Sequence, residues 1–377
     1  MYALLQDTLR LLRAEMPWLF PLCFGLFGAC IGSFLNVVIY RSPRGLSLSD
    51  PARSFCPRCE KEIPWYLNIP LLSWLILRGK CASCGGRIPF RYWLVEAATA
   101  GLFVAATMYY AQEDLLAQLM LCLWLAMAVV MIAIDAERME VLPKHALLAA
   151  AAGLGFAAFA PWLIDGTALE ASDGLMWSAA GAIAGFILMK AVAFAGKLLF
   201  GHRRIRHEEP APWSLRQCDD GEDIILTLPD GPMSWAELFA EPGNRLILED
   251  ATLFIDGAEV PGGTLTFTAD SVSTETGTAY PLEDCDTLSG TFRGLHTSRA
   301  AMGSGDAWIM LAIGALCGWE GVVFTLIAAS LLGIVGGLAT KVGRGNPMPF
   351  GPYLLAAAIL WVFGGSSLWN WYTGYFT

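Results

Sequence analysis

Long apolar stretches recur along most of this chain and limit the folds open to it. A run of about 20 apolar residues is long enough to cross a bilayer. Inside lipid such a run must be helical, because only then does the backbone satisfy its own hydrogen bonds. The sequence therefore predicts an all-α polytopic membrane protein with about eight transmembrane helices, near Trp18–Tyr40, Tyr92–Tyr110, Leu115–Asp135, Ala146–Leu163, Leu175–Phe200, Asp306–Cys317, Val322–Thr340 and Phe350–Leu368.

The composition indicates that a part outside the bilayer accompanies these spans. Of the 377 residues, 55% are hydrophobic and only 15% are charged, and the mean hydropathy is +0.52. The net charge of -10 arises in residues 201–300, which hold 18 acidic against 7 basic residues. The remainder is nearly neutral and carries no nucleic-acid signature. We therefore expect a lipid bilayer as the surroundings and no nucleic acid as a partner.

Basic residues predict the orientation of the spans. The loop of residues 41–91 contains nine Lys and Arg, whereas 111–114 and 164–174 contain none. Positively charged loops stay in the cytoplasm, so we expect the first loop there and both chain ends outside. The first span runs into Arg41 without a small-residue cleavage site, and we expect it to be retained.

Two aspartates stand at the ends of predicted spans. Asp135 closes the third span and Asp306 opens the sixth, so both are expected at the cytoplasmic face. A carboxylate in a membrane segment is costly and is a functional candidate by default. Two that meet could activate water for peptide hydrolysis, and Gly303 and Gly305 would permit close backbone approach or a positive φ beside Asp306. The alternative is that each is a helix-end charge at the interface.

Other carboxylates and a histidine compete for this role. Glu137 and Glu140, in the short loop after Asp135, are expected to be solvated, and Asp165 falls on the opposite membrane face. His145 is expected at the interface.

The first span also carries polar and small residues. Asn36 is expected to hydrogen-bond a neighbouring helix, although contact with a substrate is the alternative. A small-residue face of Gly25, Gly28, Gly32 and Ser33 favours close helix packing.

The first loop carries two cysteine pairs, Cys56-Pro57-Arg58-Cys59 and Cys81-Ala82-Ser83-Cys84, separated by 21 residues. Four thiolates at this spacing can hold zinc tetrahedrally, leaving no open position for water, so the metal would be structural. Gly85 and Gly86 allow the backbone to curl beneath the ion. A redox dithiol or disulfide pair is the alternative.

Residues 201–300 are polar, acidic and strand-like. Thr264–Ala269 alternates, with Leu265, Phe267 and Ala269 on one face. Turn signals occur at Pro229-Asp230-Gly231, Asp256-Gly257 and Pro261-Gly262-Gly263. We expect a small antiparallel β domain in the cytoplasm. It could recognise a partner or a basic segment, or serve only as a spacer.

Several segments, taken together, resemble the type IV prepilin peptidases. The similar segments are Gly32–Arg41, Pro64–Pro70, Ser73–Leu75, Arg78–Cys81, Arg91-Tyr92 with Glu96, Ala301–Asp306 and Pro349–Tyr353. They occur in the family's order and extend over roughly residues 18–200 and 300–368.

The resemblance implies a membrane aspartyl endopeptidase of the bacterial inner membrane, with its active site near the cytoplasmic face. Such enzymes remove the short basic leader from type IV pilin-like or pseudopilin precursors, usually after a glycine. Many also methylate the new amino group with S-adenosylmethionine, although no local signature of that cofactor occurs here. The family's aspartates correspond to Asp135 and Asp306, and its zinc ligands to Cys56, Cys59, Cys81 and Cys84.

The chain departs from the family pattern at three places. Lys144 follows Leu142-Pro143, where an acidic residue is usual, and Asp135 stands one residue further from Pro143 than expected. Ala307 and Trp308 stand where a lysine commonly follows Asp306. The third departure is the insert of about 100 residues before Ala301.

The sequence thus predicts five parts: an N-terminal tail with the first span (1–41), a zinc-binding loop (42–91), spans carrying Asp135 (92–200), a β-rich acidic insert (201–300) and spans carrying the Gly-x-Gly-Asp motif (301–377). An enzyme that cleaves without methylating is one alternative. A non-catalytic assembly or scaffold protein derived from the family is another, and a proton-coupled transporter is a third.

Overall fold

The computed structural model divides the chain into two compact units. One comprises Met1–Met189 with Gly305–Thr377, and the other comprises Lys190–Ser304. The structure describes residues 2–50, 53–56, 58–161, 170–200, 202–217, 224–229, 231–239, 244–282, 285, 287–298, 305–340 and 349–374.

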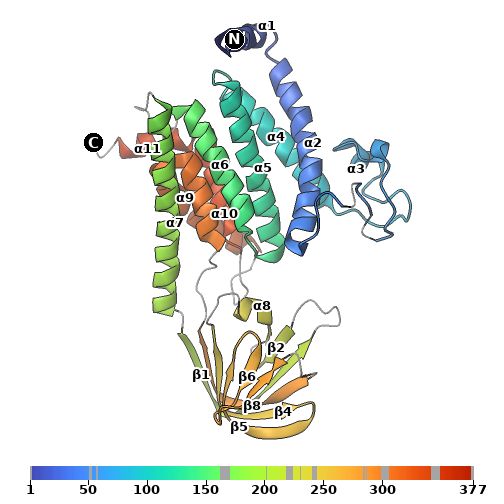
Figure 1. Cartoon of the computed structure of the whole chain (residues 1–377), viewed down its shortest axis with the longest axis vertical. Helices are drawn as coiled ribbons and strands as arrows, with labels where there is room; N and C mark the ends of the chain where they lie inside the picture. The colour runs from blue at the N-terminus through green and yellow to red at the C-terminus, as the bar shows by residue number, and fades with distance from the viewer. Residues whose placement is uncertain are drawn as a thin grey trace. The chain divides into compact units, whose positions relative to one another are not determined.

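The first unit is built from helices (Figure 1). Short 3-10 turns occur in the first loop at Ser42–Arg44 and Trp65–Leu67, and a π-helical turn at Trp361–Gly365 joins the last two helices. The α-helices are α1 (Tyr2–Glu15), α2 (Leu19–Arg41), α3 (Leu72–Ile76), α4 (Phe90–Tyr109), α5 (Leu115–Arg138), α6 (Pro143–Phe159), α7 (Ala171–Phe200, which continues past Met189), α9 (Gly305–Thr340), α10 (Gly351–Leu360) and α11 (Ser366–Thr373).

Helix α5 forms the centre of the helical unit. It packs against α4, α6 and α10, and most of its middle is fully buried, including Trp124. The Trp124 indole donates a hydrogen bond to the Ala312 carbonyl of α9 at 2.9 Å. Because α5 is apolar on all sides, as a core helix must be, its polar end at Asp135 stands out.

Glycines let α2 and α4 approach closely, as the small-residue face predicts. A Cβ at Gly28 would lie 2.9 Å from the Ala100 Cα, and one at Gly32 would lie 2.7 Å from the Glu96 Cα. The backbones therefore touch where side chains would otherwise separate them. The close approach brings Asn36 of α2 beside the first turns of α4.

Helix α9 reverses direction at Gly318, whose φ of 67° and ψ of -174° are not helical. A Cβ on Gly185 of α7 would lie 2.5 Å from the Met310 carbonyl oxygen and 3.2 Å from Val322 Cγ2. A straight helix would separate these two residues by about 18 Å, so the chain must fold back between them. The predicted sixth and seventh spans are the two arms of this element.

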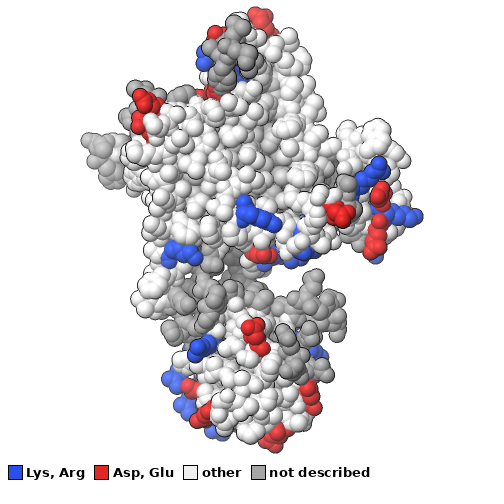
Figure 2. All heavy atoms as spheres, viewed as in Figure 1, with Lys and Arg blue, Asp and Glu red and all other residues white. Residues whose placement is uncertain are grey.

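Five described helical stretches are long and apolar enough to cross a membrane: Leu19–Arg44, Leu115–Arg138, Ala171–Gly196, Gly305–Leu338 and Gly351–Thr373. The predicted number of about eight is not confirmed. Helix α6 has only 17 residues, Arg91 and Glu96 lower the hydropathy of α4, and the two arms of α9 form one stretch. On the face drawn in Figure 2, the helical unit exposes few charged side chains.

The second unit contains an eight-stranded antiparallel sheet, which confirms a β-rich insert. Its order is β3-β2-β1-β8-β4-β5-β6-β7, and the short helix α8 (Trp235–Leu238) follows β3. The strands are β1 (His202–Gln217), β2 (Ile224–Leu228), β3 (Gly231–Ser234), β4 (Leu246–Ile255), β5 (Ala258–Phe267), β6 (Ser271–Ser273), β7 (Ala279–Pro281) and β8 (Thr287–Ser298).

The core of the sheet follows the predicted alternation in part. Leu265 and Phe267 are fully buried, and Phe267 meets Trp213 edge-on at 5.3 Å between ring centroids. Ala269, predicted to share their face, is exposed because β5 ends at Phe267.

The predicted turns have different outcomes. Asp256 and Gly257 form the tight β4–β5 hairpin, both with positive φ. The turn predicted at Pro261-Gly262-Gly263 is wrong, because these residues lie inside β5 where its register against β4 shifts. Such an irregularity is a bulge, which Gly tolerates. Asp230, in the third turn signal, lies outside the described residues.

Candidate active site and metal site

The end of α5 holds Asp135 in the interior. The helix stops after Arg138 because Met139 takes a left-handed conformation with φ 53°, and its N–H bonds the Asp135 carbonyl at 2.8 Å. The Asp135 side chain is only 4% exposed. Its Oδ2 atom has no hydrogen-bond partner among the described residues, an arrangement that needs an explanation in a buried carboxyl group.

Asp306 lies in the first turn of α9 and is 7% exposed. Gly305 permits a close approach there, because a Cβ at this position would lie 2.7 Å from the Val141 Cβ. The start of α9 therefore contacts the segment that follows α5. Gly303, the other predicted motif glycine, lies outside the described residues.

The two aspartates lie at a junction of α5, α9 and α10. A Cβ on Gly351 would lie 2.5 Å from Asp135 Oδ2 and 2.7 Å from Ile309 Cδ1. Ile309 follows Asp306 by three residues, which puts both on one face of α9. Gly351 thus touches both the Asp135 carboxyl group and the face of α9 that carries Asp306. The structure thus brings together two carboxyl groups separated by 171 positions in the chain.

Three of the four competing polar residues lie in the described part of the chain. Glu137 and Glu140 are exposed, although Glu137 belongs to the last turn of α5 rather than to a loop and forms an ion pair with Arg91. His145, expected at the membrane interface, is 7% exposed, and its Nε2 lies 2.9 Å from Ser42 Oγ. Asp165 lies outside the described residues.

The residues that depart from the family pattern near the two aspartates lie at a helix end, at a helix start and in a helix–helix contact. The left-handed Met139 ends α5, and Pro143 begins α6 after a short non-helical segment, with Lys144 following it in the first turn. Trp308 packs edge-on against Phe186 of α7, with ring centroids 5.2 Å apart. In this chain Trp308 therefore contributes packing between α7 and α9.

The four loop cysteines form one cluster that could hold a metal ion. The Sγ atoms of Cys56, Cys59, Cys81 and Cys84 all lie within 4.8 Å of one another, and Cys56 and Cys84 are 4.0 Å apart. Tetrahedral Zn–S bonds of about 2.3 Å require sulfur separations of about 3.8 Å. The cluster fits zinc, as the spacing predicts.

Two similar turns shape the cluster. In the second, Gly85 has φ 67°, as the sequence predicts, and its N–H bonds the Cys81 carbonyl. In the first turn, Glu60 follows Cys59 as Gly85 follows Cys84; it has φ 57°, and its N–H donates to the Cys56 carbonyl. The sequence does not single out Glu60, since a positive φ is uncommon for a residue other than glycine.

The metal-free thiols differ in acidity. Backbone N–H groups of Cys84 and Ser83 lower the pKa of the Cys81 thiol to about 6. A backbone hydrogen bond from Lys61 lowers the pKa of Cys59, but desolvation and the three other thiols outweigh it and raise this pKa to about 11. The cluster therefore has one thiol predisposed to be the thiolate that metal binding requires.

Polar groups also line a cavity beside this loop. The Asn36 amide donates to the Tyr92 carbonyl of α4 at 3.0 Å, which confirms the predicted bond to a neighbouring helix. Glu96 of α4 accepts from the Leu71 N–H at 2.7 Å, so it ties the loop to the helix. The sequence assigns Glu96 no role of its own, although a carboxylate inside a predicted span is a signal that could have found it.

The architecture is that of a multi-pass membrane protein with an inserted β-sheet unit and a four-cysteine site suited to a metal. Residues 26–110 match the model for the bacterial peptidase A24 N-terminal domain. Residues 265–338, which include Asp306, match that of the type IV leader peptidase family. The chain belongs to this family.

Curated relatives are named as leader peptidases as well. The prepilin leader peptidase/N-methyltransferase of Klebsiella pneumoniae is 37% identical over 196 residues, which cover 50% of this chain and 79% of that protein. The protein of that name from Legionella pneumophila is 26% identical over 386 residues, which cover 95% of this chain and 96% of that protein. The one from Myxococcus xanthus is 50% identical over 97 residues, covering 25% of this chain and only 29% of its own length. No solved structure matches the chain.

Proposed function

We propose that this protein is an aspartyl endopeptidase that removes the basic leader from type IV pilin-like or pseudopilin precursors. The observation that carries the proposal is the junction of α5, α9 and α10, where Asp135 and Asp306 are both buried and Gly351 contacts the elements that carry them. Membership of a peptidase family, and the relatives named prepilin leader peptidases, support the substrate class.

Paired carboxyl groups suit the chemistry of peptide hydrolysis. Two close like charges in a poorly solvated place cannot both ionise easily, so one group is a carboxylate and the other a carboxylic acid. The carboxylate takes a proton from water, whose oxygen then bonds to the scissile carbonyl carbon. The acid donates a hydrogen bond to the carbonyl oxygen, which becomes negatively charged as the carbonyl carbon becomes tetrahedral. The proton taken from water then passes to the leaving nitrogen as the C–N bond breaks, so the leader leaves with a carboxyl group, the mature protein gains a free amine and the carboxylate is regenerated.

The position of Asp306 suits the base role. It lies in the first turn of α9, where the helix dipole favours a negative charge. At Asp135 a backbone hydrogen bond from Gly351 of α10 also favours the negative charge, so the proton belongs to the pair rather than to one fixed member.

The site faces the cytoplasm. The basic first loop is expected on that side, and its last arginine, Arg91, pairs with Glu137 two residues after Asp135. The loop and the aspartates therefore share one end of the helices. This orientation belongs to a protein of the bacterial inner membrane.

The protein also methylates the new amino group, in keeping with the N-methyltransferase part of its relatives' names. S-adenosylmethionine, when bound, supplies the methyl group. The described structure fits this cofactor: beside the four-cysteine loop lies a cavity of about 450 Å³ whose lining includes Tyr66, Trp74 and Trp93. That volume and aromatic lining suit a nucleoside.

The test uses the purified full chain in lipid nanodiscs with a membrane-inserted pilin-like precursor and S-adenosylmethionine. We expect mass spectrometry of the product to find the leader removed and one methyl group on the new N-terminus. If the protein processes no pilin-like precursor of the same cell, the peptidase proposal is rejected and the scaffold alternative is favoured. Cleavage without methyl transfer would remove only the second activity.

The β-sheet unit has a proposed role of its own, which is to attract the basic leader. Its acidic balance would raise the encounter rate with a positively charged peptide. Strands β1 and β8 pair from His202↔Ser298 onward, so a deletion of 205–297 joins backbone ends that already lie side by side.

We expect this deletion to slow processing of basic-leader precursors about tenfold at low salt, and much less at high salt, where charges are screened. The measurement is the initial rate at matched membrane levels, with a neutralised leader as the control substrate. Equal rates for the intact and deleted proteins on every precursor would leave the unit as a spacer.

A further inference from the structure

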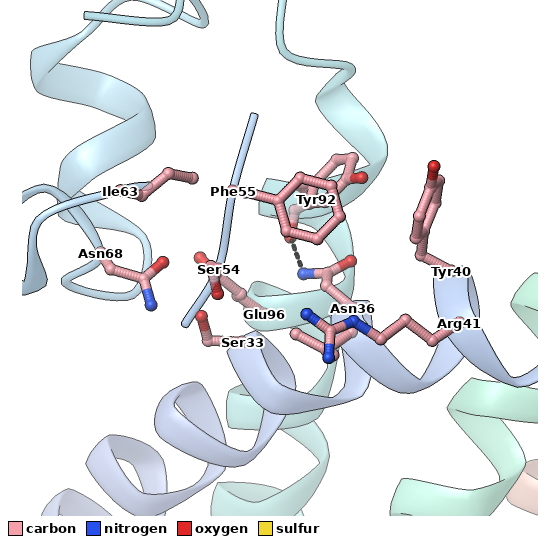
Figure 3. Close-up of a pocket in the computed structure, with 11 residues that line it drawn as sticks. Ser33, Asn36, Tyr40, Arg41, Ser54, Phe55, Ile63, Asn68, Tyr92 and Glu96 are labelled. Atoms are coloured by element: carbon pink, nitrogen blue, oxygen red, sulfur yellow. Dashed lines mark hydrogen bonds between the residues drawn. The ribbon is translucent and has the colours of Figure 1, made fainter. Parts of the chain in front are cut away.

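A small polar cavity lies where α2, α4 and the first loop meet (Figure 3). It has a volume of about 110 Å³. Helix α2 contributes Ser33, Asn36 and Arg41, α4 contributes Glu96, and Ser54 of the loop closes it. Neither Asp135 nor Asp306 lines it, so the cavity is distinct from the proposed peptidase centre.

Asn36 presents an acceptor that no described group satisfies. Its side chain is 4% exposed, and its amide nitrogen donates to the Tyr92 carbonyl, as the dashed line in Figure 3 marks. Since that carbonyl can only accept, the bond fixes which end of the amide is nitrogen. Oδ1 then lies on the other side, buried and without a partner among the described residues. A ligand with an N–H donor would complete it.

Opposite charges line the same space. Glu96 supplies a carboxylate, which accepts a hydrogen bond from the Leu71 N–H at 2.7 Å. Leu71 has φ 62°, a strained conformation for a leucine. Arg41 supplies a guanidinium that is 4% exposed and is anchored to the Ser47 carbonyl at 3.0 Å. An acceptor, an anion and a cation within one small cavity suit a zwitterion, with an ammonium group near Glu96 and Asn36 and a carboxylate near Arg41.

The small cavity adjoins the larger one. Five residues line both, namely Phe55, Ile63, Asn68, Tyr92 and Glu96. The larger cavity holds a second orphaned group, because the buried Trp93 indole N–H has no partner among the described residues. A purine or ribose acceptor would satisfy this donor. A nucleoside joined to an α-amino acid therefore matches the two cavities together.

We propose that the two cavities form the methyl-donor site, with Asn36, Glu96 and Arg41 binding the amino-acid end of S-adenosylmethionine and Trp93 contacting its nucleoside. This inference rests on the methyl transfer in the proposed function and adds the residues that recognise the donor. Asn36 and Glu96 lie on the two helices whose glycines bring their backbones into contact, which makes the site rigid.

The test is a binding measurement that needs no turnover. Equilibrium dialysis of the zinc-loaded full chain in nanodiscs would compare S-adenosylhomocysteine with methylthioadenosine, which has the nucleoside but lacks the amino-acid end. We expect the wild type to bind the first about 100-fold more tightly. Equal affinities would overturn the proposal, and this comparison holds even if every variant fails to fold.

Two variants assign the residues. Asn36→Leu and Glu96→Gln should each weaken S-adenosylhomocysteine binding about tenfold or more, and should change methylthioadenosine binding less than about twofold. The matched control is Gln118→Leu, which removes a buried carboxamide whose bonds to Tyr110 and Arg13 are already made. It should leave the ratio of the two affinities unchanged.

The outcomes separate this site from its rivals. Parallel loss of both ligands, or no loss of either, would refute the assignment. So would a raised KM for the mature substrate with unchanged S-adenosylhomocysteine binding, because the cavity would then hold the substrate's amine. A protein that binds S-adenosylhomocysteine selectively but cleaves nothing would contradict the proposed peptidase and leave this site standing. A protein that cleaves precursor but binds the two ligands equally would contradict the methyl-donor site and leave the proposed peptidase standing.

Discussion

Asp135→Asn and Asp306→Asn are each expected to lower the rate of leader removal by about a thousandfold or more. Asparagine keeps the size of aspartate and can hydrogen-bond, but it cannot exchange a proton with water or with its partner. In the proposed mechanism each carboxyl group does half of the proton transfer, so either loss stops the reaction. The measurement is the fraction of co-expressed precursor processed at matched membrane levels of enzyme.

The control for these variants is Glu137→Gln. Glu137 lies two residues after Asp135 and forms a partly exposed ion pair with Arg91. Glutamine can still accept a hydrogen bond from Arg91, and ion pairs near the surface contribute little to stability, so this variant should process precursor at close to the wild-type rate. S-adenosylhomocysteine binding should survive in all three variants, because the methyl-donor cavities contain none of these residues. Substantial cleavage by either aspartate variant would rule out the two-carboxylate mechanism.

Burial makes this pair more than two charged helix ends. A helix-end aspartate at an interface would be solvated, whereas Asp135 and Asp306 are 4% and 7% exposed. Gly351 approaches Asp135 so closely that a side chain there would displace the carboxylate. We therefore expect the approach of α10 to control the space left for water and substrate beside Asp135.

Features that depend on neighbouring residues in the chain could be predicted from the sequence. The cysteine spacing predicts the cluster because each pair closes its own turn, and Gly85 marks one turn directly. Alternation predicts the inward face of Leu265 and Phe267, because period-2 patterning is local to a strand. The apolar runs predict helices for the same reason.

The sequence indicates some tertiary contacts, such as the bond from Asn36 to a neighbouring helix, but others could not be predicted. The bulge at Pro261–Gly263 looks like a turn until β4 is seen beside it. Nothing in the sequence near Gly318 shows that α9 reverses there. The reversal is recognised from the contacts of α7 with both arms of α9. The cavity of Asn36 and Glu96 joins residues from separate helices, and its orphaned acceptor becomes visible only when the bond to Tyr92 fixes the amide. Sequence patterns indicate that these residues are polar, but not that they converge.

Loss of the loop metal is the second prediction with a large effect. Cys81→Ser and Cys84→Ser should each abolish stoichiometric zinc, since a structural site needs all four thiolates. Cys56 and Cys81 also line the larger cavity, so an unfolded loop would open the nucleoside site. We expect S-adenosylhomocysteine affinity to fall about tenfold or more, because metal binding contributes directly to folding of such loops. Zinc content is measured by elemental analysis and ligand binding by dialysis.

Leader removal should respond differently to the same change. Asp135 and Asp306 are held by α5, α9 and α10, whereas the metal holds the segment between α2 and α4, so cleavage should fall far less than methyl-donor binding. Cys23→Ser, which changes an exposed cysteine of α2 outside the cluster, should retain zinc and both activities. If the cluster variants lose zinc yet bind S-adenosylhomocysteine normally, the loop does not shape the methyl-donor site. If cleavage and binding instead fall by equal factors, the loop supports the whole helical unit and the two activities do not have separable structural bases.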